Sequence, residues 1–311
     1  MPSSFPALIL TAGLGTRLRP LTEVRAKAAV PVAGEPLIRR IARWLVGQGV
    51  SDLVLNLHHR PETIAAAMGD GSDLGARVRY SWEQPVVLGA AGGPRQALPI
   101  VGADTFFLIN GDTLTDFTLA GLVDAHQSTG AAVTLALLPN HQPDRYGGLR
   151  LDAEQRVIGF APRGRAEGSY HFFGVQLVAA SVFASLPPGQ PARSIGGVYD
   201  ALIASQPGAI HGLVADAAFW DVGTVADYWL TSWSFAQAEG TADVTRGRGG
   251  HIDPTARVSR SILWDDVEIG SECVIDECVV TDGVRVPPGG SYRRTILLPA
   301  AQGAVRTAPL S

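Results

Sequence analysis

Short apolar runs alternate with stretches of helical periodicity over the first two-thirds of the chain. Ala7–Thr11 is a continuous apolar run, which is typical of a strand covered on both faces of a sheet. Leu37–Val46 carries apolar residues on one face and arginines opposite, and it ends at Gly47–Gly49, so it predicts an amphipathic helix. By the same reasoning we predict helices at Pro61–Met68 and Leu119–Ser128, and strands at Leu53–Leu57, Val78–Ser81, Phe106–Ile109 and Ala132–Leu138.

This alternation of strand and helix favours an α/β fold in which a mostly parallel sheet carries helices on both faces. In such sheets, ligands bind beyond the carboxyl ends of the strands. The loops after Thr11 and Ile109 are therefore the first places to look for functional residues.

The pattern changes from about Gly240, where the polar, glycine-rich stretch Thr241–Gly250 predicts a linker. Beyond it, apolar residues recur about every six positions, with single-residue slips. They are Ile252, Val258, Trp264, Ile269, Ile275, Val280 and Val286. This spacing predicts a short parallel β-helix of about two coils, with a sandwich-like pair of hairpins as the alternative.

Composition and charge exclude several classes of protein. The formal net charge is −4 and there is no run of Lys or Arg, so binding to a nucleic-acid backbone is not expected. No apolar stretch is long enough for a membrane span, and the N-terminus lacks the charged region of a secretory signal. Cys273 and Cys278 form neither a disulfide framework nor a zinc motif, so we expect two small buried residues. A cytoplasmic protein is the expectation.

Lysine is almost absent, because Lys27 is the only lysine among 25 Lys and Arg residues. Codon bias explains the general preference for arginine. A single remaining lysine is then either accidental or a position that requires a compact ammonium group rather than a planar guanidinium.

A glycine-rich segment, TAGLGTRLRPLT, follows the first predicted strand and starts at Thr11. It lacks the Gly-Lys-Ser/Thr of a Walker loop, and Leu18 stands where a dinucleotide fingerprint has its third glycine. Two glycines directly after a buried strand still allow backbone N–H groups to bind an anion. Thr16 and Arg17 add a hydroxyl and a guanidinium donor.

Four ordered motifs give the chain a resemblance to the sugar-1-phosphate nucleotidyltransferases. The glycine-rich segment, Lys27 and Val30–Ile38 (VPVAGEPLI) resemble the family's signature. The blocks LGAAG from Leu88, LINGD from Leu108 and FWDVGT from Phe219 resemble its base-contacting, strand-end and WxDxGT motifs. The tail is similar to that of the mannose-1-phosphate guanylyltransferase branch, and the N-terminal part resembles the branch that uridylylates N-acetylmuramate 1-phosphate.

The resemblance implies a Rossmann-like catalytic domain over residues 1–240 and a left-handed β-helical tail over residues 241–311. It also implies that a sugar 1-phosphate attacks the α-phosphorus of a nucleoside triphosphate and releases pyrophosphate. Because the attacking group is already an anion, the site must hold two polyanions and neutralise charge rather than supply a nucleophile.

The resemblance also assigns roles to individual residues of this sequence. Arg17 would clamp the triphosphate and Lys27 would bridge the two reacting phosphates, while Asp112 and Asp221 would bind Mg²⁺. The expected nucleotide-binding residues are Ala12, Gly13, Gly15, Thr16, Gln84, Leu88 and Gly89. The expected sugar-binding residues are Asn110, Gly147 and Gly174. The structural alternatives are a turn for Asp112, a helix cap for Asp221 and a solvated loop position for Arg17.

Two departures from the family pattern change what the resemblance implies. Alanines, not prolines, flank Lys27, so its loop is less stiff. The Glu-Lys pair expected near Ile158–Arg163 is missing, and His171-Phe172-Phe173-Gly174 stands where an Asn often occurs. Sugar recognition has therefore been rebuilt in this chain.

Two other readings remain open at the sequence level. A regulatory paralogue would keep the fold and bind a nucleotide sugar without turnover, but it would not need both metal carboxylates. An acyltransferase tail would need several coils and a catalytic base, and the tail region contains only His251. We expect instead that the tail packs on the catalytic domain or joins subunits in a homo-oligomer.

Overall fold

A computed structural model describes residues 5–241 and 243–310. The chain divides into two compact units. The sheet unit comprises the chain up to Leu14 together with Ile41–Phe219, and the β-helix unit comprises Gly15–Arg40 together with the chain from Trp220 onward. The glycine-rich segment therefore begins in one unit and continues into the other.

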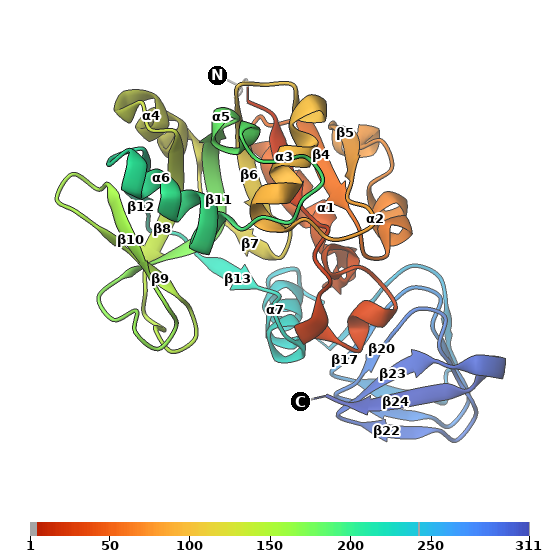
Figure 1. The fold of residues 1–311 in the computed structure, drawn as a ribbon. Helices are drawn as coiled ribbons and strands as arrows, with labels where there is room; N and C mark the ends of the chain where they lie inside the picture. Colours follow the sequence, from red (N-terminus) through yellow and green to blue (C-terminus); the bar gives the residue numbers. More distant parts are fainter. Residues whose placement is uncertain (1–4, 242, 311) are drawn as a thin grey trace. The chain divides into compact units, whose positions relative to one another are not determined.

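The sheet unit is built on one mixed nine-stranded sheet (Figure 1). Its main path follows the order β10-β9-β11-β6-β1-β4-β5, and β8 pairs with β11 and β12. The neighbours β6, β1, β4 and β5 are parallel, whereas β11 runs antiparallel to β6 and β8. The strands are β1 (Ala7–Leu10), β4 (Asp52–Leu57), β5 (Arg77–Trp82), β6 (Thr105–Asn110), β8 (Val133–Pro139), β9 (Gly148–Leu151), β10 (Val157–Ala161), β11 (Tyr170–Ala179) and β12 (Ile210–Val214).

Helices pack against this sheet and close an apolar core. α3 packs against β1, β4 and β5, whereas α4 packs against β8, β11 and β12. The core contains Leu8, Val54, Phe106 and Leu135, all essentially buried. The helices are α1 (Leu37–Gly47), α2 (Pro61–Met68), α3 (Gly89–Val101), α4 (Leu119–Thr129), α5 (Ser181–Ala184) and α6 (Tyr199–Ser205). The predicted strands and helices of the first half are confirmed to within two residues at each end.

The β-helix unit begins with three short 3-10 turns and a small hairpin. The turns span Thr16–Leu18, Leu21–Glu23 and Lys27–Ala29, and the hairpin pairs β2 (Pro31–Val32) with β3 (Glu35–Pro36). α7 (Val225–Ala238) packs against β2 and against the Thr16–Leu18 turn. The residues before α1 thus form a compact body with a helix from much later in the sequence.

Stacked parallel strands form the rest of this unit, drawn in blue in Figure 1. Three ladders repeat with a period of 17 residues, as in the pairing of Arg257 with Val274 and of Val274 with Ser291. The strands are β14 (Val244–Arg246), β15 (His251–Ile252), β16 (Arg257–Ser259), β17 (Ser261–Leu263), β18 (Glu268–Ile269), β19 (Val274–Asp276), β20 (Val279–Val280), β21 (Arg285–Val286), β22 (Ser291–Arg293), β23 (Thr295–Pro299) and β24 (Val305–Pro309). The predicted parallel β-helix is confirmed and the hairpin-pair alternative is excluded.

Two details of the tail prediction are wrong. The ladders comprise three strands each, with β23 and the antiparallel β24 added to one of them, so the stack exceeds two coils. Trp264 does not belong to the stacked apolar column, because Leu263 pairs with Val280 in that ladder. The side chain of Trp264 instead contacts Tyr228 of α7. The error arises because the true period is 17 residues rather than a multiple of six.

Candidate active site

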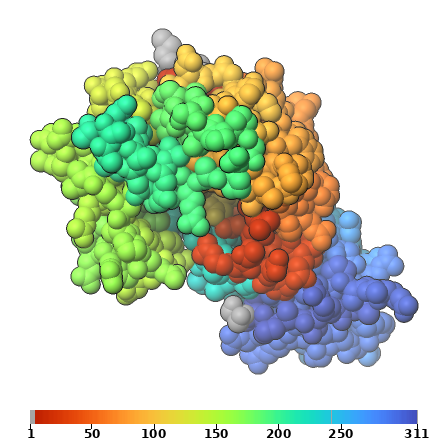
Figure 2. Space-filling model, viewed as in Figure 1, coloured from red at the N-terminus to blue at the C-terminus, as the bar shows by residue number. Residues whose placement is uncertain are grey.

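The loop after β1 is fixed at its start by Asn56, at the end of β4. The side-chain Oδ1 of Asn56 accepts hydrogen bonds from the N–H groups of Thr11 at 2.5 Å and Ala12 at 3.2 Å. Since the N–H of Ala12 is occupied in this way, contact with a nucleotide at Ala12 would use its carbonyl. Gly13 is exposed, and the red N-terminal part of the chain reaches the molecular surface (Figure 2).

Asn56 also connects this loop to the predicted base-binding block. Its Nδ2 donates to Oε1 of Glu83 at 2.6 Å, and Oε2 of Glu83 accepts the N–H of Leu88 at 2.6 Å. Burial raises the pKa of Glu83, although the hydrogen bonds from Leu88 and Asn56 oppose this shift. We did not predict Asn56 or Glu83 from the sequence. The sequence signal for Glu83 is its position directly before Gln84, which is predicted to bind the nucleotide and is exposed.

The β-helix unit holds the second half of the glycine-rich segment. Gly15 has a φ of +59°, and a Cβ there would lie 2.6 Å from Cγ2 of Thr22 and 3.2 Å from Cβ of Lys27. Glycine is therefore required for this close approach as well as for the left-handed backbone. Thr16 and Arg17 are exposed in the turn that packs against α7, and Lys27 is half-buried in its own turn.

The end of β6 carries the predicted residues Asn110 and Asp112. A Cβ at Gly174, whose φ is +88°, would lie 2.7 Å from the side chain of Asn110. Asn110 and Gly174, both predicted to bind sugar, are thus brought together by the pairing of β11 with β6. Asp112 is partly exposed in the turn between β6 and β7 (Thr113–Thr115).

An aromatic cluster stands near these residues, where the sequence departs from the family pattern. The rings of Tyr146 and His171 have centroids 4.3 Å apart, and that of Phe219 lies 5.1 Å from His171. Burial lowers the pKa of His171 to about 4, helped by the charge of Arg145 and opposed by a hydrogen bond with Gly147. His171 is therefore neutral at pH 7 and contributes to an apolar wall. Gly147, which is predicted to bind sugar, forms a backbone hydrogen bond with His171 of this cluster.

Asp221 ends β13 (Phe219–Asp221) and lies close to the start of α7 without capping it. The N-cap is Thr224, which forms a reciprocal capping box with Asp227. The helix-cap alternative for Asp221 is therefore excluded. A Cβ at Gly223 would lie 2.9 Å from Oδ2 of Asp221, so a larger residue would crowd this carboxylate.

The predicted site residues fall into two groups, one in each unit. Ala12, Gly13, Gln84, Leu88, Gly89, Asn110, Asp112, Gly147 and Gly174 belong to the sheet unit. Gly15, Thr16, Arg17, Lys27 and Asp221 belong to the β-helix unit. Within residues 5–241 and 243–310, no group of three or more His, Cys, Asp or Glu side chains is arranged to hold a metal ion.

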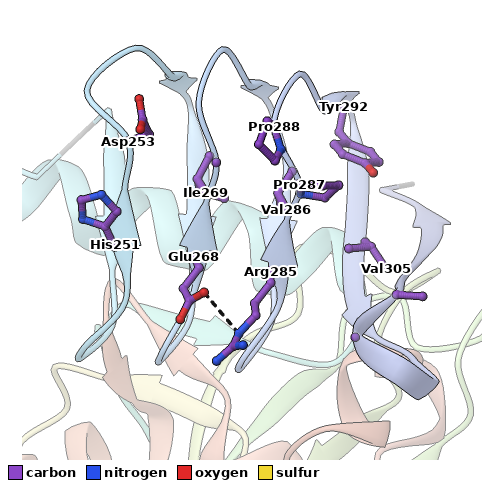
Figure 3. A pocket seen from close by; sticks show the side chains of 13 residues that line it. His251, Asp253, Glu268, Ile269, Arg285, Val286, Pro287, Pro288, Tyr292 and Val305 are labelled. Atoms are coloured by element: carbon purple, nitrogen blue, oxygen red, sulfur yellow. Dashed lines mark ion pairs between the residues drawn. The ribbon is translucent and has the colours of Figure 1, made fainter.

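A separate groove of about 540 Å³ lies on the β-helix itself (Figure 3). Its lining is of mixed charge, with His251, Asp253 and the ion pair between Glu268 and Arg285 at 3.2 Å. None of the predicted nucleotide- or sugar-binding residues lines it. Among the described helices, none has the length and apolar character that crossing a membrane requires.

Comparisons with known proteins match almost the entire chain. A family model described as nucleotidyl transferase matches residues 6–237, and one described as GlmU-like, C-terminal hexapeptide matches residues 245–292. Mannose-1-phosphate guanylyltransferase of Mycobacterium tuberculosis is 31% identical over 294 residues, covering 91% of this chain and 81% of that protein. N-acetylmuramate alpha-1-phosphate uridylyltransferase of Neisseria meningitidis serogroup B is 35% identical over 193 residues, covering 60% of this chain and 80% of that protein.

Solved structures share the fold. HddC from Yersinia pseudotuberculosis aligns with a TM-score of 0.65 at 22% identity, covering 74% of this chain and 99% of that one. The same protein has been solved in complex with GMP-PN and aligns with a TM-score of 0.64.

Proposed function

The chain belongs to the nucleotidyl transferase family, and we propose that it transfers a nucleoside monophosphate from a nucleoside triphosphate to a sugar 1-phosphate. The observation that carries this proposal is the match to sugar-1-phosphate nucleotidyltransferases over about nine-tenths of the chain. Arg17, Lys27, Asp112 and Asp221 are all present within the matched range.

The reaction needs positioning and charge neutralisation rather than a protein nucleophile. A phosphate oxygen of the sugar 1-phosphate forms a bond to the α-phosphorus, the bond from that phosphorus to the bridging oxygen breaks, and pyrophosphate leaves. Because the nucleophile is already anionic, the protein's task is to hold two polyanions at reacting distance.

The glycine-rich segment is suited to the triphosphate. Gly13, Gly15 and Thr16 offer backbone or hydroxyl donors, and the exposed guanidinium of Arg17 would clamp the phosphates. Lys27 would bridge the α-phosphate and the sugar phosphate with a compact, freely turning ammonium. Ala12, Gln84, Leu88 and Gly89 would hold the nucleoside, with Glu83 and Asn56 fixing the loops that carry them.

The sugar would meet the residues at the end of β6 and their neighbours. Asn110, Gly147 and Gly174 would provide polar and backbone contacts. The neutral ring of His171, packed against Tyr146 and Phe219, would form an apolar wall beside them. A neutral, weakly polar face of the sugar would pack there.

Mg²⁺ is the metal that this chemistry requires. Asp112 and Asp221 would hold it, because carboxylate oxygens together with substrate phosphates are the ligands that Mg²⁺ takes in proteins. Their donor chemistry fits, and both side chains are partly exposed and so accessible to an ion carried by the triphosphate. The bound ion would neutralise charge on the transferring phosphate.

We propose that residues 1–240 form the catalytic domain and residues 241–311 a β-helical tail that packs on it or joins subunits. We also propose a cytoplasmic location, because that is where nucleoside triphosphates and sugar 1-phosphates are available.

A pyrophosphate-release screen tests the proposal. Four nucleoside triphosphates are combined with a panel of sugar 1-phosphates, with Mg²⁺ and with EDTA. The first pairs are GTP with mannose 1-phosphate, and UTP with N-acetylmuramate 1-phosphate or glucose 1-phosphate, because relatives carry those names. Metal-dependent release with at least one pair is expected. No turnover with any pair, together with tight binding of a nucleotide sugar, would replace the proposal by a regulatory paralogue.

A further inference from the structure

Arg25 lies two residues before Lys27 and is held by two carboxylates of the β-helix. Its Nε and Nη2 donate to the two oxygens of Asp282 at 2.6 and 2.7 Å, and Nη2 also donates to Asp265 at 2.8 Å. Only 11% of the Arg25 side chain is exposed. The remaining nitrogen, Nη1, donates to the carbonyl of Ala29 at 3.4 Å, so this one side chain links the tail to the last residue of the Lys27–Ala29 turn.

Main-chain N–H groups of the β-helix hold the two carboxylates independently of Arg25. Asp265 and Asp282 occupy equivalent positions one coil apart, and the N–H of Asp265 donates to Oδ1 of Asp282 at 3.1 Å. The N–H of Arg248 donates to Oδ1 of Asp265 at 2.8 Å. Two carboxylates stacked in this way repel each other unless a cation is shared between them. A planar guanidinium with several donors satisfies that requirement.

A second connection reaches the chain on the other side of Lys27. The indole N–H of Trp264 donates to the hydroxyl of Tyr228 at 2.9 Å, and that hydroxyl donates to the carbonyl of Pro31 at 2.9 Å. Trp264 and Tyr228 are both essentially fully buried. The guanidinium of Arg25 lies 5.5 Å from the centre of the Trp264 ring, so the two connections touch.

These contacts lie on both sides of the segment in which alanines, not prolines, flank Lys27. Lys27 stands between Ala26 and Ala28, and two main-chain hydrogen bonds close its short turn: Ala29 N–H to the carbonyl of Ala26 at 2.8 Å, and Val30 N–H to the carbonyl of Lys27 at 3.4 Å. Tertiary hydrogen bonds at Arg25 and Pro31, one on each side of this turn, supply rigidity that the local sequence does not.

We propose that Arg25 is a positioning residue that, through Asp265 and Asp282 of the β-helix, holds Lys27 at the reacting phosphates. The tail thereby takes part in catalysis without touching substrate. This inference rests on the proposed function, because the role of Lys27 is part of it. A misplacement of about 1 Å in a positioned group can lower a rate about 10²-fold.

The single lysine provides a direct readout. Protein labelled with ¹³C at lysine Cε gives one side-chain signal, which comes from Lys27. We expect Asp282→Asn and Asp265→Asn, singly and combined, to shift or broaden that signal in the full-length protein. In turnover assays, we expect the double variant to lose about 10- to 100-fold in kcat, with a smaller change in KM.

Asp276→Asn is the matched control. Asp276 is also a β-helix aspartate with an arginine partner, Arg260 at 2.9 Å, and its side chain is 18% exposed, as is that of Asp265. It lies in β19, whereas the carboxylates that accept from Arg25 are those of Asp265 and Asp282. We expect the Lys27 signal and the turnover of this variant to match the wild type.

The outcomes separate the two proposals. If the double variant is folded and neither its Lys27 signal nor its kcat differs from the wild type, the positioning role is wrong while the proposed function stands. If the wild type shows no turnover but the signal responds only to Asp265 and Asp282, the positioning stands and the proposed function fails. If the double variant does not fold, each single variant decides by the same criteria, with hydrogen exchange of the peptide containing Lys27 as a second measurement.

Discussion

At the scale of single residues, Lys27 is unusual in two ways, as the one lysine of the sequence and in its close packing against Gly15. It is the only lysine in the chain, and a Cβ at Gly15 would approach its own Cβ to 3.2 Å. The glycine-rich segment and the lysine are therefore packed as one local structure. A position that keeps lysine in an arginine-rich protein is best explained by a need for a compact ammonium.

The variant Lys27→Arg tests that need because it preserves the charge. The planar guanidinium cannot reproduce the geometry of a point charge between two phosphates, so we expect kcat to fall about 10²- to 10³-fold. Steady-state pyrophosphate release measures the effect. Arg285→Lys, at a side chain that is 72% exposed, is the reciprocal control and should be neutral. Turnover of Lys27→Arg at the wild-type rate would mean that the lone lysine is accidental.

Asp112 is the second residue whose chemistry can be isolated. Asp112→Asn removes the charge of the proposed Mg²⁺ ligand without changing the size of the side chain, so metal-dependent turnover should fall about 10²-fold or more while the melting temperature stays the same. Asp124→Asn, on an exposed position of α4, should have no effect on either quantity. Full activity of Asp112→Asn would remove Asp112 from the metal site.

At the scale of elements, a buried polar network joins β4, the loop after β5 and α3. Glu83 accepts from Asn56 and from the N–H of Leu88, while Oδ1 of Asn56 is committed to Thr11 and Ala12. Because Asn56 cannot turn its amide over without losing those bonds, both oxygens of Glu83 must be acceptors.

Glu83→Gln places an NH₂ group against one of these two donors. We expect unfolding in urea to show a loss of about 1–3 kcal/mol, since a buried donor is left without an acceptor. The KM for the nucleoside triphosphate should rise, because the loops at Ala12 and Leu88 lose their common anchor. Glu62→Gln, at an exposed carboxylate of α2, is the control. An unchanged urea midpoint for Glu83→Gln would contradict the network's importance.

The aromatic cluster of β11 makes a prediction about pH. The pKa of His171 is lowered to about 4 by burial, whereas that of an unfolded histidine is about 6.5. Between these values the unfolded chain binds more protons than the folded one, so the free energy of unfolding decreases as the pH falls from 6.5 towards 4. The full effect is at most about 3 kcal/mol.

Urea unfolding of the wild type and of His171→Gln across that pH range measures the contribution of this histidine. The difference between the two curves should shrink with acidification. His141→Gln, at an exposed position, should follow the wild type. Parallel curves for wild type and His171→Gln would show that burial does not perturb this histidine.

Sequence patterns located regular elements well and irregular ones poorly. α2 was predicted with both its ends, because its apolar spacing, its N-terminal proline and the following glycine agree. α3 was missed because it contains two glycines and two prolines in its interior. Gly93 is needed there because a Cβ would lie 2.4 Å from Oε1 of Glu83, which is a tertiary reason that periodicity does not register.

At the scale of the whole molecule, each unit has its own apolar core. That of the sheet unit lies around Leu8, Phe106 and Leu135, and that of the β-helix contains Leu263, Ile275, Val280 and both cysteines. The expectation that Cys273 and Cys278 are buried and unpaired is confirmed. The cysteines can therefore report on the β-helix separately from the catalytic sheet.

Alkylation with iodoacetamide at pH 8 should leave both thiols unmodified in the folded protein and modify both in urea. Burial raises the pKa of Cys278 to about 11, so almost no reactive thiolate is present in the folded state. Mass spectrometry of the variant Cys273→Ser isolates the signal of Cys278. Rapid labelling of Cys278 without denaturant would contradict the burial of this core.

The sequence by itself determined the chemical inventory of this protein. The apolar runs specified the strands and helices of the first half, because side-chain periodicity is a local property. The order of the motifs specified the family, and it predicts which residues bind phosphate, base and metal. What the tail's repeat did not specify was its 17-residue period, which left Trp264 assigned to the wrong face.

Only the tertiary structure decided what holds those residues in place. Asn56 reaches Thr11 across 45 positions of sequence, and Arg25 reaches Asp265 across 240. No local pattern encodes such pairs, because a buried polar group is satisfied by whatever donor or acceptor the fold brings to it. The sequence therefore predicts the residues that bind substrate, whereas the residues that hold them in place can be identified only from the fold.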